Sequence, residues 1–211
     1  MTHLPMFPLG AVLFPSMPLA LRVFEQRYLE MLAAVLQDEP PEFGVVLIER
    51  GQEVGGGDAR FGIGTVARVS ELNAGEGFIA VLGVGVRRIE IVEWLDEAPY
   101  PVAEVREMAP LEWTEEHREQ LDATERAVRS ALAVASEFAD LSWSADVEIA
   151  TEPVAAAWQL AAIAPLGAMD QVALLGATTI PQLLDGIREG TESALDQLRF
   201  AALDDEAPGD E

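Results

Sequence analysis

The chain opens with an apolar segment, Leu4–Leu21, whose length alone could suggest a membrane span or an export signal. Four prolines interrupt this segment, and each of them lacks a backbone donor and fixes its own φ angle. A helix interrupted so often would leave carbonyl groups unpaired in lipid. The residues before it, Met1-Thr2-His3, also lack the basic n-region of a secretory signal. The pattern therefore predicts short extended pieces, separated by turns, in the core of a soluble protein.

The rest of the first half predicts one helix among several strands. Apolar residues recur at helical spacing over Phe24–Gln37, and Pro40-Pro41 ends this helix; its predicted buried face holds Phe24, Tyr28, Met31, Leu32, Val35 and Leu36. Strand-length apolar or alternating runs follow at Phe43–Glu49, Phe61–Leu72, Gly77–Val86, Arg87–Leu95 and Pro101–Glu107. The glycine-rich stretch Gly51–Gly57 predicts a loop. Several short strands with one early helix favour a small, partly closed barrel or sandwich.

After Pro110 the apolar spacing becomes helical. Thr114 is a candidate N-cap for a first helix, whose buried face would hold Leu121, Thr124, Val128, Leu132 and Ala135. A second helix would start at Glu152-Pro153 and end near Ala164, and a short third would cover Met169–Leu175 with Gly176 as its C-terminal cap. The last helix starts with a capping box, Thr179-x-x-Gln182, and its apolar face would hold Leu184, Ile187, Thr191, Leu195 and Leu198. We therefore expect a β-rich domain over 1–110, a helical subdomain over 111–203 and a disordered acidic tail over 204–211.

Composition narrows the chemistry. The net charge is −24, with −8 in residues 1–110 and −16 in residues 111–211, and a surface this acidic repels phosphate backbones and anionic lipid headgroups. All 13 basic residues are arginines, so this chain holds no Walker lysine, Schiff-base lysine or serine–lysine dyad. The chain has no cysteine, which excludes thiol nucleophiles, disulfides and thiolate metal sites. Without disulfides or a targeting signal, we expect a cytoplasmic protein.

The motifs that could carry chemistry are weak. Gly62–Ala67 matches the dinucleotide fingerprint, but a glycine loop precedes it and an alternating strand follows, so we interpret it and Gly83-Val84-Gly85 as glycines at strand bends. His3 and His117 are too far apart to suggest a metal site or a triad. No spacing singles out a carboxylate pair, and no serine lies in a nucleophile elbow. We therefore predict no enzymatic activity, no metal and no cofactor.

Two groups of charged residues are candidates for specific interactions, Arg87-Arg88 for binding and Glu25 with Arg27 for a structural role. Arg87-Arg88 is the only adjacent basic pair, and strand alternation should turn one arginine inward and the other outward. These two are candidate polar binding contacts, although pairing with nearby acids is the favoured interpretation. Glu25 and Arg27 lie near the start of the predicted first helix, where Glu25 could interact with the helix dipole and Arg27 could bridge to an acid on a neighbouring strand.

The run from Leu4 to Tyr28, which ends in Phe24-Glu25-Gln26-Arg27-Tyr28, resembles the start of the Lon N-terminal (substrate-binding) domain, most closely its stand-alone bacterial version. The resemblance begins with the run from Leu4 to Tyr28 and continues with looser matches through the helical half. The residues that carry it, which we expect to be mainly structural, are Pro8, Leu9, Phe14, Pro15, Phe24, Glu25, Arg27, Tyr28, Gly44, Gly64, Gly83 and Tyr100. One departure is Ser16, which stands where the family usually has glycine after Phe-Pro, so the turn there is expected to differ.

The resemblance implies an α+β fold, in which a PUA-like β pseudo-barrel with one early helix precedes an α-helical subdomain. It also implies a non-enzymatic protein-binding module that recognises unfolded or extended protein segments, without ATPase or protease domains in this sequence. The acidic surface favours basic segments and disfavours nucleic acid and membranes. Two alternatives stay open: a PUA-like RNA-binding protein, which the charge disfavours, and a small-molecule sensor with a pocket between the two subdomains.

Overall fold

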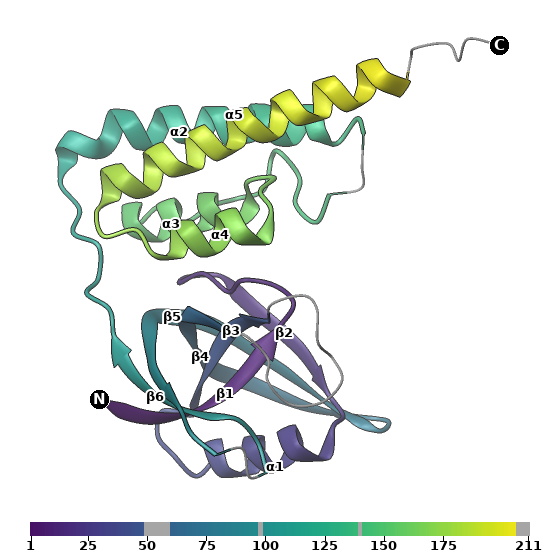
Figure 1. The fold of residues 1–211 in the computed structure, drawn as a ribbon, viewed down its shortest axis with the longest axis vertical. Helices are drawn as coiled ribbons and strands as arrows, with labels where there is room; N and C mark the ends of the chain where they lie inside the picture. The colour runs from purple at the N-terminus through teal and green to yellow at the C-terminus, as the bar shows by residue number, and fades with distance from the viewer. Residues whose placement is uncertain (49–59, 97–98, 139–140, 206–211) are drawn as a thin grey trace. The chain divides into compact units, whose positions relative to one another are not determined.

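The computed structural model describes residues 1–48, 60–96, 99–138 and 141–205. The chain divides into two compact units, Met1–Pro110 and Leu111–Glu211, which we call the strand unit and the helical unit (Figure 1). The predicted α+β class is confirmed, with a sheet in the first unit and helices in the second. The predicted loop Gly51–Gly57 lies outside the described residues.

The strand unit is a six-stranded sheet that closes on itself. Its strands are β1 (Thr2–Leu9), β2 (Pro18–Val23), β3 (Glu42–Ile48), β4 (Arg60–Gly75), β5 (Phe78–Trp94) and β6 (Val102–Glu107), and α1 (Gln26–Val35) follows β2. The order is β2-β5-β4-β3-β1-β6, and β5 also pairs with β6, so every strand except β2 belongs to a closed ring. Only the β1–β3 pairing is parallel. Apolar side chains from the ring fill its centre: Met6, Val46, Val66, Ile89, Ala103 and Val105.

The prediction of two strands over Gly77–Val86 and Arg87–Leu95 is wrong, because β5 runs through both as one strand of 17 residues. The strand bends where its register with β4 shifts, between Val66 and Ala67 and between Val69 and Glu71. A side chain at Gly85 would overlap the carbonyl oxygen of Phe14, and one at Gly83 would overlap that of Arg68. These glycines therefore permit the close approach of backbones that the bend requires.

The other glycine pattern has the same structural role. Gly62–Ala67 lies inside β4, and no helix follows it, so the structure excludes the dinucleotide fingerprint. A side chain at Gly64 would overlap the carbonyl oxygen of Val45 on β3. Glycine is therefore needed there so that β3 and β4 can pair closely.

The first helix was predicted to begin at Phe24, which is two residues too early. α1 starts at Gln26, and its buried residues are Tyr28, Met31, Leu32 and Val35. Phe24 lies before the helix and is 69% exposed, and Leu36 just after it is 42% exposed, so neither belongs to the buried face. Helical spacing alone could not show this, because Glu25 has an extended backbone and changes the direction of the chain ahead of the helix.

The turn between β1 and β2 contains a serine in a left-handed conformation. Ser16 has φ of 63°, the region that glycine adopts without steric penalty. Its backbone N–H donates to the carbonyl oxygen of Gly85 at 2.8 Å, and Gly85 donates in return to Met17 at 2.9 Å. The turn thus keeps a glycine-like backbone despite its serine, and these two hydrogen bonds hold it against β5.

The helical unit contains α2 (Arg118–Ala135), α3 (Pro153–Ile163), α4 (Ala168–Leu175) and α5 (Ile180–Asp205), with a single 3-10 turn, η1 (Glu115–His117), before α2. The predicted helix start at Glu152-Pro153 is confirmed, since α3 begins at Pro153. The Glu152 carboxylate caps this helix by accepting from Val154 and Ala155 N–H at 3.0 and 2.6 Å. Thr114 precedes η1 rather than a helix, and its side chain makes no capping hydrogen bond. The predicted tail is partly wrong, because α5 includes Asp204 and Asp205, while 206–211 lie outside the described residues.

The start of α5 uses a variant of the predicted capping box. Thr179 Oγ1 accepts from Gln182 N–H at 3.2 Å, as expected for an N-cap. The Gln182 side chain, however, reaches back to Thr178, whose N–H it accepts at 2.9 Å, and not to the N–H of Thr179. The Thr179 side chain thus satisfies a donor of the first helical turn, and the Gln182 side chain satisfies a donor just before the helix.

One buried hydroxyl in α5 lacks a hydrogen bond. Thr191 is 1% exposed, and its Oγ1 has no partner among the described residues. Thr124 in α2 is equally buried, but its Oγ1 donates to the carbonyl oxygen of Gln120 at 2.9 Å. Burying a hydroxyl group costs desolvation free energy, and a hydrogen bond inside the protein offsets this cost. The Thr191 hydroxyl lacks this compensation.

Ser16 supplies the first stability prediction. The Ser16→Gly variant should have a free energy of unfolding about 1 kcal/mol higher than that of the Ser16→Ala variant. Alanine is strained in the left-handed backbone conformation, whereas glycine adopts it without strain. Comparing these two variants cancels the loss of the hydroxyl, which both share. Chemical denaturation would measure the difference, and an alanine variant as stable as the glycine variant would contradict the strain.

Thr191 supplies the second stability prediction. Thr191→Val should raise the free energy of unfolding by about 1 kcal/mol, since it removes a buried hydroxyl without a partner and preserves shape. The matched control is Thr124→Val, which loses a hydrogen bond and should lower stability by up to about 1 kcal/mol. Thermal unfolding of both variants would test this, and the idea fails if Thr191→Val is no more stable than Thr124→Val.

Candidate functional site

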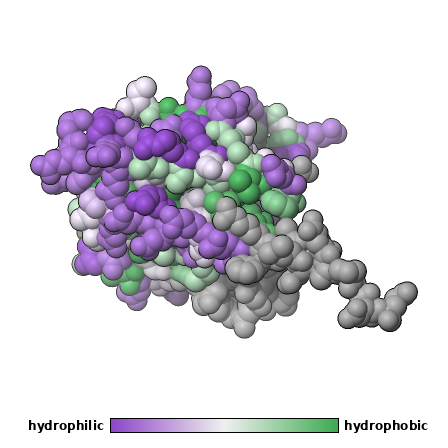
Figure 2. Space-filling view, turned by 90° about the horizontal axis from the view of Figure 1, so that it is seen from above, coloured by the Kyte–Doolittle hydropathy of each residue, from purple (hydrophilic) through white to green (hydrophobic). Residues whose placement is uncertain are grey.

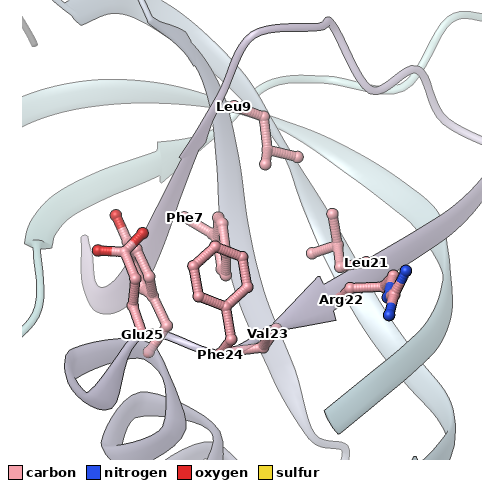
Figure 3. Close-up of a pocket in the computed structure, with 8 residues that line it drawn as sticks. Phe7, Leu9, Leu21, Arg22, Val23, Phe24 and Glu25 are labelled. Carbon is pink, nitrogen blue, oxygen red and sulfur yellow. The ribbon is translucent and has the colours of Figure 1, made fainter. Parts of the chain in front are cut away.

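A pocket opens on the strand unit between β1, β2 and the start of α1 (Figure 3). Its volume is about 160 Å³. The residues that line it come from three consecutive elements of the first part of the chain: Phe7, Leu9, Leu21, Arg22, Val23, Phe24, Glu25 and Tyr28. β1 and β2 do not pair with each other, so the pocket occupies the opening that the sheet leaves between them.

Aromatic rings form one wall of the pocket. Phe7 stacks on Tyr28 with ring centroids 4.1 Å apart and an interplanar angle of 18°. Phe43 of β3 lies behind Phe7, with centroids 6.1 Å apart. Tyr28 is held from α1 and is 6% exposed, so the stack is anchored to the barrel core. This arrangement gives the pocket a rigid apolar wall that needs little ordering when a ligand binds.

The rim of the pocket combines one exposed ring with charged side chains. Phe24 is the most exposed aromatic residue described, and its ring is drawn in Figure 3 among the residues that line the pocket. Arg22 places its guanidinium 4.0 Å from the ring centroid of Phe78. Glu25 accepts a hydrogen bond from Arg27 Nε at 3.1 Å. The rim thus presents one exposed aromatic ring, and its two charged side chains, Arg22 and Glu25, already contact other residues of the protein.

The size and lining of the pocket limit what it can hold. Pockets for drug-sized ligands and cofactors have volumes of roughly 300–1,000 Å³. This one is close to the roughly 150 Å³ cavity that holds a benzene molecule. Its lining contains a single carboxylate, Glu25, which leaves no second acid in the pocket for general acid–base chemistry. The pocket therefore suits one large apolar side chain.

Arg87 and Arg88 lie on β5, away from the residues that line this pocket. Arg87 bridges Glu42 of β3 and Glu107 of β6, at 2.6 Å to each. Burial lowers the pKa of Arg87, but hydrogen bonds to these two carboxylates outweigh burial and raise it above its ordinary value. Arg88 points inward, is 5% exposed and donates to the carbonyl oxygen of Ala109 at 2.8 Å, and burial lowers its pKa. Both arginines are engaged by the protein itself.

The residues of the expected family motif separate into two groups. Leu9, Phe24, Glu25 and Tyr28 line the pocket, and Arg27 stacks its guanidinium 4.6 Å from the Tyr28 ring centroid. The others support the fold: Pro8 lies on β1, Phe14 and Pro15 are buried in the turn, Gly44, Gly64 and Gly83 permit close packing, and Tyr100 is half-buried before β6. Sequence reasoning missed Phe7, Leu21, Arg22 and Val23. Strand alternation could have placed Phe7 beside Leu9 on one face, but it could not bring β1 near β2.

Comparison with known proteins decides the family. A family model described as the ATP-dependent protease La (LON) substrate-binding domain matches residues 3–189. The chain belongs to this family. Its relatives include "Lon protease 2" of Myxococcus xanthus, 35% identical over 105 residues, and "Lon protease" of Anaeromyxobacter dehalogenans, 34% identical over 105 residues. Each match covers 48% of this chain but only 13% and 12% of those proteases, respectively.

Solved structures show the same fold. A Lon N-terminal domain protein from Xanthomonas campestris aligns with a TM-score of 0.62 and 24% identity, over 87% of this chain and 95% of that one. The N-terminal domain of the Mycobacterium avium complex Lon protease aligns with a TM-score of 0.64 and 15% identity, over 90% and 98%. The predicted Lon-type fold is therefore confirmed.

The face drawn in Figure 2 is dominated by hydrophilic residues, with smaller apolar areas between them. Among the described residues, no helix combines the length and apolar character needed to cross a membrane. Within the same residues, no group of three or more histidine and acidic side chains is placed to hold a metal ion.

The charge network around Glu42 supplies a prediction about the scaffold of the site. Glu42, whose side chain is 9% exposed, pairs with Arg68 at 2.8 Å and Arg87 at 2.6 Å, which links β3 to β4 and β5. Glu42→Gln should lower the free energy of unfolding by roughly 1–3 kcal/mol, because two arginines lose a shielded carboxylate.

The matched control is Glu90→Gln, which removes a more exposed partner of Arg106 on the same sheet. It should cost at most about 1 kcal/mol, the usual range for exposed ion pairs. Urea unfolding of both variants would compare them. Equal losses would show that the network around Glu42 adds nothing beyond an ordinary surface pair.

Proposed function

We propose that this chain is a non-enzymatic module that binds exposed apolar segments of other proteins in the pocket beside Phe24. The observation that carries the proposal is a small, aromatic-walled pocket with an exposed phenylalanine at its mouth. A folded protein hides its large apolar side chains, whereas an unfolded or extended segment exposes them. A pocket that accepts one such side chain would therefore distinguish non-native proteins from folded ones.

The substrate-binding family supports this proposal, as does the charge of the chain. The family model is named for substrate binding by an ATP-dependent protease. A net charge of −24 would attract basic segments over long distances and repel acidic ones. We therefore expect the partners to be unfolded or extended segments with basic residues near the apolar anchor.

The RNA-binding alternative finds less support in the strand unit. The arginines whose side chains are described in this unit are already engaged with carboxylates, rings or carbonyl groups: Arg22, Arg27, Arg68, Arg87, Arg88 and Arg106. Binding a phosphate backbone requires cations that can release counterions. The sensor alternative concerns a pocket between the two subdomains, so the size of the pocket beside Phe24, which lies within the strand unit, does not test it.

A binding titration tests the proposal. The probe is reduced and carbamidomethylated lysozyme, a basic chain that cannot refold, labelled for fluorescence anisotropy. It should bind saturably at low and moderate salt, whereas native lysozyme should not. Phe24→Ser should weaken binding about tenfold, because the partner loses an aromatic contact at the pocket mouth.

The matched control is Phe138→Ser, which removes another half-exposed phenylalanine, this one in the helical unit. It should leave the affinity unchanged. If the unfolded probe shows no saturable binding at either salt concentration, the proposed function is wrong. If the two serine variants weaken binding equally, the pocket beside Phe24 is not the binding site.

A further inference from the structure

Among the described strands, β2 alone pairs on a single side. Its six residues, Pro18–Val23, pair antiparallel with the first part of β5, and β2 stands at the end of the strand order. The other edge of β2 lies beside the pocket, because Leu21, Arg22 and Val23 of this strand line the pocket. An unpaired strand edge offers a row of N–H and C=O groups to another chain.

Two observations fix which backbone groups face the open edge. Gly85 N–H donates to the carbonyl oxygen of Met17 at 2.9 Å. In an antiparallel pair, every second residue is hydrogen-bonded to its partner. The backbone groups of Leu19, Leu21 and Val23 therefore face β5 as well. The tight turn of the β4–β5 hairpin independently shows which residues of β5 face β2. Gly75 pairs with Phe78 across two turn residues, which directs Phe78, Ala80 and Leu82 to β4 and the residues between them to β2.

The groups left over on β2 belong to Pro18, Ala20 and Arg22. No described residue hydrogen-bonds the backbone of Ala20 or Arg22. Proline at position 18 has no N–H, so the row of free donors begins at Ala20. Side chains follow the complementary alternation: Leu19 and Val23 are buried and Leu21 is half-buried, while Ala20 and Arg22 are exposed.

We propose that the bound segment adds to β2 as an antiparallel strand and inserts one apolar side chain, opposite Leu21, into the pocket. This inference rests on the proposed function and specifies its geometry. The residues on either side of the anchor would exchange backbone hydrogen bonds with Ala20 and Arg22. Antiparallel pairing is the more stable arrangement and is the one that β2 makes with β5.

The geometry also defines the chemistry of the occupant. Side chains of an added strand alternate between the two faces, so the anchor would contact Phe7, Leu9 and Leu21 while its neighbours face solvent. The solvent-facing positions experience the field of a chain with net charge −24, which favours lysine or arginine. The occupant is therefore an extended basic segment with one aromatic or large aliphatic residue between polar ones.

A peptide with selective backbone methylation tests this register. The probe is a labelled seven-residue peptide with a central phenylalanine between alternating threonine and arginine residues. N-methylation of either residue next to the phenylalanine should weaken binding at least about fivefold, because it removes a donor to β2. N-methylation of the phenylalanine itself should leave binding nearly unchanged, since its N–H faces away from β2.

A pair of protein variants tests the same hydrogen bonds from the other side. Ala20→Pro removes an N–H that β5 does not use, and proline is tolerated at such an edge position. It should weaken binding at least about fivefold, whereas Ala20→Val, which keeps the N–H, should bind like the native chain. Circular dichroism confirms that each variant is folded, and the peptide series stands by itself if Ala20→Pro does not fold.

The outcomes separate this inference from the proposed function. If unfolded lysozyme binds but the unmethylated peptide does not, the occupant inferred here is wrong and the proposed function stands. If neither probe binds, the proposed function itself is wrong. If it binds and Phe24→Ser weakens it, but all methylated peptides bind equally, the pocket is used without strand addition. If methylation of the phenylalanine abolishes binding and methylation of its neighbours does not, the antiparallel register is wrong.

Discussion

The architecture of the strand unit depends on the sharing of β5 among three other strands. The first part of β5 pairs with β2 and β4, and its second part pairs with β4 and β6. The strand can serve both groups only because it bends, and Gly83 and Gly85 permit the close backbone contacts at the bend. β6 pairs with the second part of β5 and closes the ring there, whereas β2 pairs only with the first part of β5 and keeps its other edge open. The pocket follows directly, because β1 and β2 lie next to each other without pairing.

The chemistry around this opening is consistent with recognition without catalysis. The walls are aromatic and aliphatic, and the charged side chains at the rim already pair within the protein, as Glu25 does with Arg27. The acidic surface acts at longer range than these contacts, so it would influence which segments approach and how fast. The pocket and the strand edge would then decide which segments remain bound. This division lets a small site discriminate by shape while the whole chain supplies the electrostatic attraction.

The sequence predicted those parts of the molecule that local physics determines. Glu152 before Pro153 and Thr179 before Gln182 mark helix starts because their side chains cap nearby backbone donors, and the structure contains these bonds. The glycines of β4 and β5 were interpreted as strand bends and not as a nucleotide site, and the structure adds that they allow close backbone contacts. Phe24 was wrongly placed on the buried face of the first helix, because the spacing of apolar residues does not show that the backbone is still extended at Glu25. The pocket could not be predicted, since it depends on the order of strands that are distant in sequence, and half of its lining was therefore missed.

Strand addition at β2 requires that the amides of Ala20 and Arg22 face an open edge that a partner fills. Residue-resolved amide hydrogen exchange tests this claim directly. In the free protein, the amides of Ala20 and Arg22 should exchange faster than those of Leu19 and Leu21, which face β5. Saturation with the central-phenylalanine peptide should then slow Ala20 and Arg22 by about tenfold or more. Protection elsewhere, with these two amides unchanged, would contradict strand addition at β2.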